Sequence, residues 1–279
     1  MIAAILPKQS RGATQVRHQL AILVSLVTCL LPGLVHAGAW TLAEGDGQVI
    51  ITTGRHATPA TSLFRGTAHK DKSNVYVFVE FGVTDEFTVG TTASGEWLTT
   101  TSQLDLRLGG HARYRLWQGN AGDVLSLQLG GSGPVQGWFG DPMLGSTDDN
   151  VVEIDASVLY GRGWVSDWGN SFVSLETGFK WRGDGRPDEL RAEISSGHAI
   201  SRRFMGLFGV YIAHPLGDGS DTSLKLAPSF AWTMWPRLGA NDKKPADFSH
   251  PRTLQIGASY DVLQPDDGLG FYISVWNRF

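Results

Sequence analysis

Hydrophobic and polar residues alternate at every second position through most of the chain that follows residue 37. The clearest case is segment 104–117, where Leu106 and Tyr114 share a face without charge while Arg107 and Arg113 share the other. A helix would scatter these charges around its circumference, whereas a β-strand places successive side chains on opposite faces. Similar sorting recurs in later segments. The pattern therefore predicts an all-β protein whose strands each have one charge-free face.

Twelve strands are expected from this alternation, many of them longer than usual globular strands. Their ranges are 47–55, 75–83, 87–97, 104–117, 124–133, 151–161, 171–182, 188–197, 204–214, 223–235, 253–263 and 269–279. The favoured fold is a closed antiparallel transmembrane β-barrel. Ten or fourteen strands stay possible, because the long polar segment 236–252 falls at the end where turns of such barrels are short. The alternative is a soluble β-sandwich, in which the apolar faces would pack against each other.

The N-terminus has the order of a secretory signal. Basic residues precede the apolar run 20–31, Pro32 breaks the run, and small residues lead to Ala37. The run is about half the ~20 residues that a membrane-spanning helix needs, so a permanent anchor is the less favoured alternative. We therefore expect residues 1–37 to be cleaved and residues 38–279 to form the barrel.

Composition and charge narrow the class further. The chain has 23 basic and 27 acidic residues; three basic ones lie in the signal, which leaves a net charge of −7 and argues against nucleic acid as a partner. The single cysteine, Cys29, also lies in the signal, so disulfides and thiolate sites are excluded from the mature chain. Tryptophans near the predicted strand ends, including Trp97 and Trp276, are interpreted as an aromatic girdle at the membrane interface.

The last strand carries a family resemblance. Phe271, Ile273 and Val275 alternate toward the terminal Phe279, which resembles the terminal strand of Gram-negative outer-membrane barrels, although Asn277 departs from that pattern. The resemblance implies an outer-membrane location among lipid and lipopolysaccharide, and recognition of the Phe279 strand by the barrel-assembly machinery.

Two further segments, 38–50 and 80–90, resemble a loosely defined group of putative outer-membrane transporters from aromatic-degradation gene clusters. This resemblance implies location and architecture, and supplies no substrate.

If the apolar faces meet lipid, the polar faces line the barrel interior. The predicted lumen-lining residues are Asp105, Arg107, His111, Arg113, Arg115, Glu153, Asp155, Glu176, Lys180, Glu189, Arg191, Glu193, Lys225 and Asp261. Basic residues concentrate on strand 104–117 and acidic ones on strands 151–161 and 188–197. We interpret this distribution as opposed walls with a transverse field across a pore. The favoured function is passive passage of a small, unidentified solute through a mixed-charge lumen.

Two alternatives stay open: a closed structural barrel, and an outer-membrane lipid hydrolase. No serine lies in a G-x-S-x-G nucleophile elbow, and His111 shares its face with three arginines, so we expect no enzyme and no catalytic residue. No histidine pair has zinc-helix spacing, and neither a metal nor a cofactor is expected.

Overall fold

The computed structural model describes residues 38–58, 70–98, 103–135, 152–166, 169–183, 186–217, 221–234, 252–264 and 269–279. Within them lie twelve β-strands. The strands are β1 (Gly47–Thr58), β2 (Lys70–Thr84), β3 (Phe87–Leu98), β4 (Gln103–Gln118), β5 (Asp123–Pro134), β6 (Glu153–Ser166), β7 (Gly169–Arg182), β8 (Glu189–Ala199), β9 (Phe204–Pro215), β10 (Ser223–Met234), β11 (Arg252–Asp261) and β12 (Leu269–Arg278).

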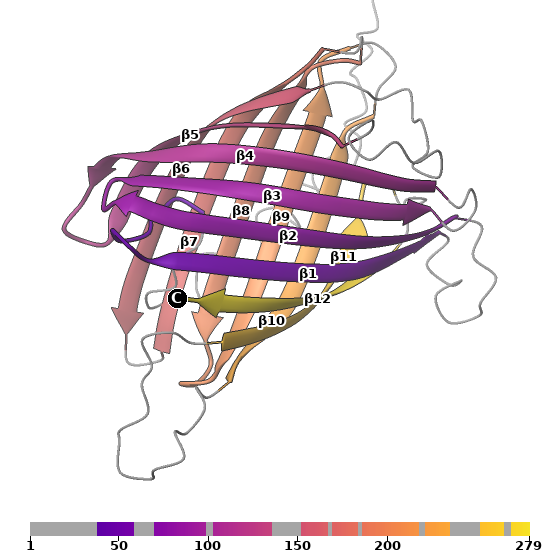
Figure 1. The fold of residues 1–279 in the computed structure, drawn as a ribbon. Coiled ribbons are helices and arrows are strands. Elements are labelled where there is room, and N and C mark those ends of the chain that lie inside the picture. Colours follow the sequence, from indigo (N-terminus) through magenta and orange to yellow (C-terminus); the bar gives the residue numbers. More distant parts are fainter. Residues whose placement is uncertain are drawn as a thin grey trace, which may run out of the picture.

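Each strand pairs antiparallel with its neighbours in sequence, and β12 returns to pair with β1, which closes the sheet into a barrel (Figure 1). The closing ladder runs from Gln48 opposite Arg278 to Ala57 opposite Leu269. The prediction of an all-β, closed antiparallel barrel of twelve strands is confirmed. A closed sheet leaves no edge with unpaired backbone groups, as a membrane-spanning sheet requires.

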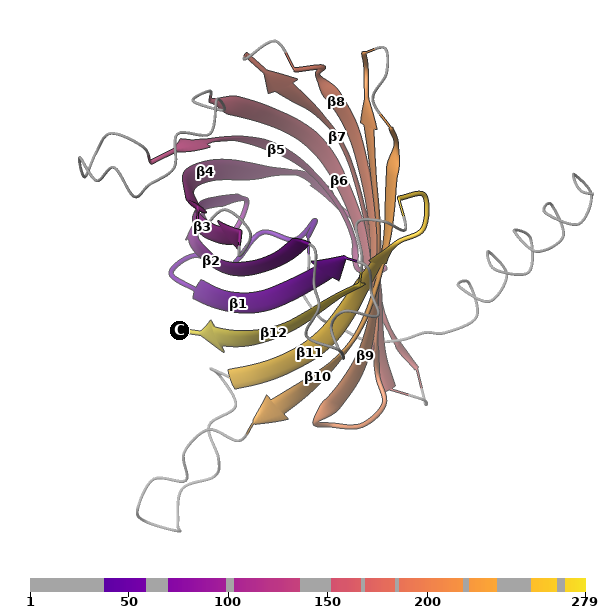
Figure 2. The same ribbon diagram turned by 90° about the vertical axis from the view of Figure 1, so that its right-hand side faces the viewer.

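The apolar faces of the strands form the outer surface. Leu129 is 60% exposed, Ile154 48% and Ile256 54%, and many large apolar side chains on other strands are similarly exposed. A β-sandwich would bury these side chains between its two sheets. The sandwich alternative is therefore wrong, and Figure 2 shows the strands curving around one common interior.

The two ends of the barrel differ in what they contain. We call the end that holds residues 38–46, the turn between β2 and β3, and Phe279 the terminal end; the other is the distal end. Phe279 exchanges two backbone hydrogen bonds with Gly47 there, at 2.7 and 2.9 Å. In the turn, the Thr84 hydroxyl accepts the N–H of Phe87 at 3.1 Å.

Two predicted strand bounds are wrong by five residues: β6 ends at Ser166 rather than at residue 161, and the other error concerns the start of β2. This strand begins at Lys70 rather than at residue 75, and residues 70–74 pair with β1 as far as Thr58. These residues are polar on both faces, so alternation gives no signal there. The gap 56–74 between the first two predicted strands is correspondingly too long.

Several predicted segments lie outside the described residues. They include the signal at 1–37 and most of the polar segment 236–252, which joins β10 to β11. Both strands run so that this connection falls at the terminal end, as the count of twelve implied. Within the described ranges, no helix is long and apolar enough to cross a membrane.

Candidate functional site: the barrel interior

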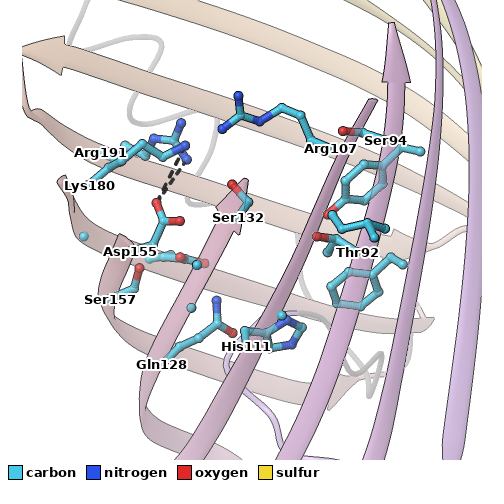
Figure 3. Close-up of a pocket in the computed structure, with 18 of the residues that line it drawn as sticks. Thr92, Ser94, Arg107, His111, Gln128, Ser132, Asp155, Ser157, Lys180 and Arg191 are labelled. Carbon is cyan, nitrogen blue, oxygen red and sulfur yellow. Dashed lines mark ion pairs between the residues drawn. The ribbon is translucent and has the colours of Figure 1, made fainter. Parts of the chain in front are cut away.

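A cavity of about 340 Å³ lies against the inner wall formed by β2 to β8 (Figure 3). Six of the predicted lumen residues line it: Arg107, His111, Asp155, Glu176, Lys180 and Arg191. Neutral residues such as Gln128 and Ser132, which charge sorting could not single out, contribute to the same surface. Alternation thus indicates which strand face points inward, while the cavity itself depends on how the wall curves.

The charged residues at the distal side of this cavity form one connected network, which we call the distal cluster. Its members are Arg107, Glu153, Asp155, Lys180, Arg182, Arg186, Glu189 and Arg191. Glu153 is 6% exposed and lies 2.7 Å from the Lys180 Nζ and 3.3 Å from an Arg107 nitrogen. A carboxylate buried to this degree requires such paired charges, because desolvation disfavours an isolated one.

The distal cluster contradicts the expectation of opposed walls. Strands β4 and β6 are both neighbours of β5, so the basic and acidic strands lie close together on one wall. Arg107 of β4 consequently reaches Glu153 of β6, and Arg191 pairs with Glu189 on its own strand β8. The charges pair by direct contact rather than across the lumen, and the five basic and three acidic residues of the distal cluster leave an excess of two positive charges. Sequence reasoning missed this because it located the strands without their curvature.

A second group, the terminal cluster, is centred on Glu80 of β2. Glu80 is 2% exposed; one of its carboxylate oxygens lies 2.9 Å from both the His111 ring and an Arg113 nitrogen, and the other accepts a hydrogen bond from Gln48 at 2.6 Å. Arg113 also donates two hydrogen bonds to the Gln128 side chain, at 2.8 and 3.0 Å. The predicted residues His111 and Arg113 therefore belong to a compact network of ion pairs and hydrogen bonds around Glu80.

The chain segment before β1 lies inside the barrel at the terminal end. We call residues 38–46 the N-terminal segment. Ala39 is fully buried, and its carbonyl accepts a hydrogen bond from the Ser126 hydroxyl at 2.6 Å. The Trp40 carbonyl accepts one from Arg113 at 3.1 Å, and the Leu42 N–H donates to the Thr88 hydroxyl at 2.9 Å.

Small residues of the wall make room for this segment. A Cβ at Gly161 of β6 would lie 2.6 Å from the Trp40 ring, so only glycine fits at that position. The same ring meets Phe172 of β7 edge-on, with centroids 6.3 Å apart. The N-terminal segment therefore crosses the interior from β1 toward β7 and narrows the lumen. Sequence analysis had no signal for it, since the segment has no periodicity.

The remaining predicted residues have other partners. Arg115 lies 3.3 Å from Glu86 at the terminal end, and Glu193 accepts a hydrogen bond from Ser195 at 2.7 Å. Asp261 is 2% exposed, and its carboxylate accepts the backbone N–H groups of three residues around the end of β11, which makes it a structural residue of that turn. Glu176 lines the cavity beside the distal cluster, Lys225 lines a cavity on another part of the wall, and Asp105 of β4 lies opposite Glu96 of β3.

One pair bears on the hydrolase alternative. The Ser171 hydroxyl lies 2.9 Å from Nδ1 of His198, and both residues occupy outward positions of their strands, β7 and β8. Ser171 is fully buried, and no carboxylate in the described part of the chain is hydrogen-bonded to His198. An activated serine needs access to substrate and a group that orients its base. The pair lacks both.

Metal chemistry has no candidate site among the described residues, where no three histidine, cysteine, aspartate or glutamate side chains are grouped so that they could hold an ion.

No protein-family model matches the chain, and no curated protein sequence matches it. The fold, however, is similar to that of several solved structures. An outer membrane channel from Pseudomonas putida F1 superimposes with a TM-score of 0.54 at 13% identity, covering 88% of this chain and all of that one. The NanC porin gives 0.54 at 8% identity, covering 82% of this chain and 98% of its own. A KdgM porin in complex with disordered oligogalacturonate gives 0.51 at 5% identity, with 83% and 98% covered. The chain thus has the porin-like barrel fold.

Proposed function

We propose that this protein is an outer-membrane channel that lets small solutes pass down their concentration gradient. The observation that carries the proposal is the two-sided wall: exposed large apolar side chains on the outside, and polar residues around cavities on the inside. Such a wall suits hydrocarbon on one face and water on the other. The likeness to porins and to an outer-membrane channel is in keeping with it.

A barrel of twelve strands is intermediate in width. Side chains fill the interior of barrels with about eight strands, whereas the wider porins hold an aqueous channel. The N-terminal segment and the two clusters take up part of the interior, so the proposed passage is narrow. The charged part of this passage is the cavity beside the distal cluster, and Arg107 is one of the residues that line that cavity (Figure 3). We therefore expect small unitary conductance rather than the large steps of a general porin.

Planar-bilayer recording tests the proposal. Purified protein should give discrete current steps, and Arg107→Ala should change the unitary conductance or the ion selectivity, as should the double variant with Arg113→Ala. Arg162→Ala is the matched control, because this arginine is about half exposed and pairs with Asp123 on the outer surface. A folded wild-type barrel that never conducts would overturn the channel proposal.

The second candidate is a closed structural barrel. The extent to which interior charges are paired, together with the N-terminal segment in the lumen, favours it. Absence of current from folded protein would support this alternative. Hydrolysis of phospholipid by purified protein, abolished by Ser171→Ala, would instead establish the lipid hydrolase.

We also propose that the mature chain lies in the outer membrane of a Gram-negative bacterium after removal of residues 1–37. The barrel fold supports this location, as does the exposed apolar face of β12, which leads to Phe279. Membrane fractionation, with N-terminal sequencing of the mature protein, tests it: recovery in the inner membrane, or a retained signal, would contradict it. The resemblance to putative outer-membrane transporters from aromatic-degradation gene clusters stays a prediction.

A further inference from the structure

A second cavity, of about 400 Å³, lies against a different part of the inner wall, formed mainly by β1 and β9 to β12. It shares no lining residue with the cavity beside the distal cluster. Its lining contains no acidic residue, and Lys225 is its one residue with a fixed charge. Lys225 also borders a neighbouring cavity that contains Glu176 and Glu193. These two acids offset the lysine, so the second cavity offers little net attraction for an anion.

Two tyrosine rings lie over glycines of this wall. A Cβ on Gly257 would come within 2.3 Å of the Tyr272 ring, and a Cβ on Gly209 within 2.8 Å of the Tyr211 ring. With no side chain beneath it, such a ring can lie along the wall with one face toward the lumen. The two rings therefore form a platform for the C–H face of a flat, saturated ring.

Polar groups surround this platform, and two of them lack partners. The Trp276 indole N–H and the side-chain oxygen Oδ1 of Asn74 are buried and have no hydrogen-bond partner. Buried polar atoms of native proteins are nearly always hydrogen-bonded, so each exception calls for an explanation. One is a donor and the other an acceptor, which a hydroxyl-bearing ligand can satisfy together.

The spacing of these two groups indicates the size of the ligand. Trp276 lies opposite Ile50 of β1 and Asn74 lies opposite Gly54, four residues further along the same strand. At about 3.3 Å per residue, the two positions are about 13 Å apart along the strand direction, and they lie on the two strands that flank β1, about 10 Å apart across it. The Trp276 and Asn74 side chains both reach into this gap, so a ligand of two linked pyranose rings suffices to bridge it.

We propose that the second cavity binds an uncharged, hydroxyl-rich solute of disaccharide size, which stacks on Tyr272 and bonds Trp276 and Asn74. The site deepens the proposed channel function by naming a solute class, and it rests on that function only for passage of the solute. Binding itself requires no current, so it can be measured separately.

The test is calorimetric titration of the refolded protein in detergent with maltose as the probe. We expect saturable binding, weakened at least tenfold by Tyr272→Ser, which removes the ring of the platform on which the solute stacks. Trp276→Phe keeps a ring but removes the unpaired N–H, and should weaken binding several-fold. Tyr76→Ser is the matched control: this inward tyrosine lines the other cavity and should change affinity less than twofold. Heat-modifiable electrophoretic mobility shows that each variant has folded.

Three results would overturn the proposal: no maltose binding to folded wild type, equal weakening by Tyr76→Ser and Tyr272→Ser, or binding of benzoate in place of maltose. The last would assign the cavity to aromatic anions. Maltose binding without any current would support this site and refute the channel proposal. Current without maltose binding would support the channel and refute this site.

Discussion

The hydrogen bonds between the N-terminal segment and the barrel wall should control the conductance of the protein. The double variant Thr88→Val, Ser126→Ala removes two hydroxyls that bond this segment at 2.9 and 2.6 Å. Both side chains are fully buried, and both substitutions nearly preserve volume. A typical hydrogen bond contributes about 1 kcal/mol, so the segment should lose about 2 kcal/mol of its attachment. Since 1.4 kcal/mol is a factor of ten, release of the segment should become about 30-fold more frequent.

Single-channel recording measures this as the fraction of time spent in a higher-conductance state. The matched control is Thr52→Val, which removes a partly buried 2.8 Å hydrogen bond to Ser274 on a part of the wall that does not hold the segment. A reversible lock is available too. A Cβ on Gly38 would lie 3.3 Å from that of Ser174, slightly closer than the about 3.5–4.5 Å usual in disulfides, so the pair Gly38→Cys and Ser174→Cys should suppress the high state until a reductant is added, at some cost in backbone strain because Gly38 has a φ of +66°. Unchanged current in the double variant, or equal gain in the control, would refute the reasoning.

Two other substitutions and one deletion test the wall and its closure. Ile256→Lys places a charge on an outward position that is 54% exposed, and should lower the free energy of unfolding in lipid vesicles by about 2–4 kcal/mol; urea titration with no loss would contradict a lipid-facing wall. Gly122→Ala should cost more than about 1 kcal/mol in the same assay, because Gly122 has a φ of +83° and its Cβ would meet the Gly163 carbonyl at 2.6 Å. Deletion of Phe279, whose backbone bonds Gly47, should lower the amount of barrel in the outer membrane several-fold while Phe279→Tyr does not, as fractionation and immunoblotting can show.

The fold was predictable because the alternation persists over nearly every strand. Charges sort to one face in segment 104–117, and the structure gives a strand there with almost the same bounds. Where both faces of a strand are polar, as at residues 70–74, alternation does not distinguish a strand from a loop. The prediction for Trp276, as part of an interfacial girdle, was also wrong. This side chain lines an interior cavity, whereas Trp97 is outward and 44% exposed.

The interior was predictable only as a set of inward positions. Which charges pair depends on strand neighbours and on the curvature of the sheet. Arg107 and Glu153 are far apart in sequence and two strands apart in the barrel, yet they lie 3.3 Å apart. Neutral groups that complete the terminal cluster, such as Gln48, carry no sequence signal of their role.

The distribution of small residues explains how one barrel can hold both a polypeptide segment and open cavities. At Gly161, the missing side chain makes room for Trp40 of the N-terminal segment. At Gly257, the missing side chain likewise lets Tyr272 lie against the wall, and the cavity extends on the lumen side of this ring. Glycine in a strand weakens it, so its use at inward positions is explained by close approach of another group. The N-terminal segment narrows the terminal end while the two cavities lie along the wall beyond it. A solute that enters from the distal end would therefore meet either cavity before it reaches the segment, and selectivity and gating would reside in separate parts of the same lumen.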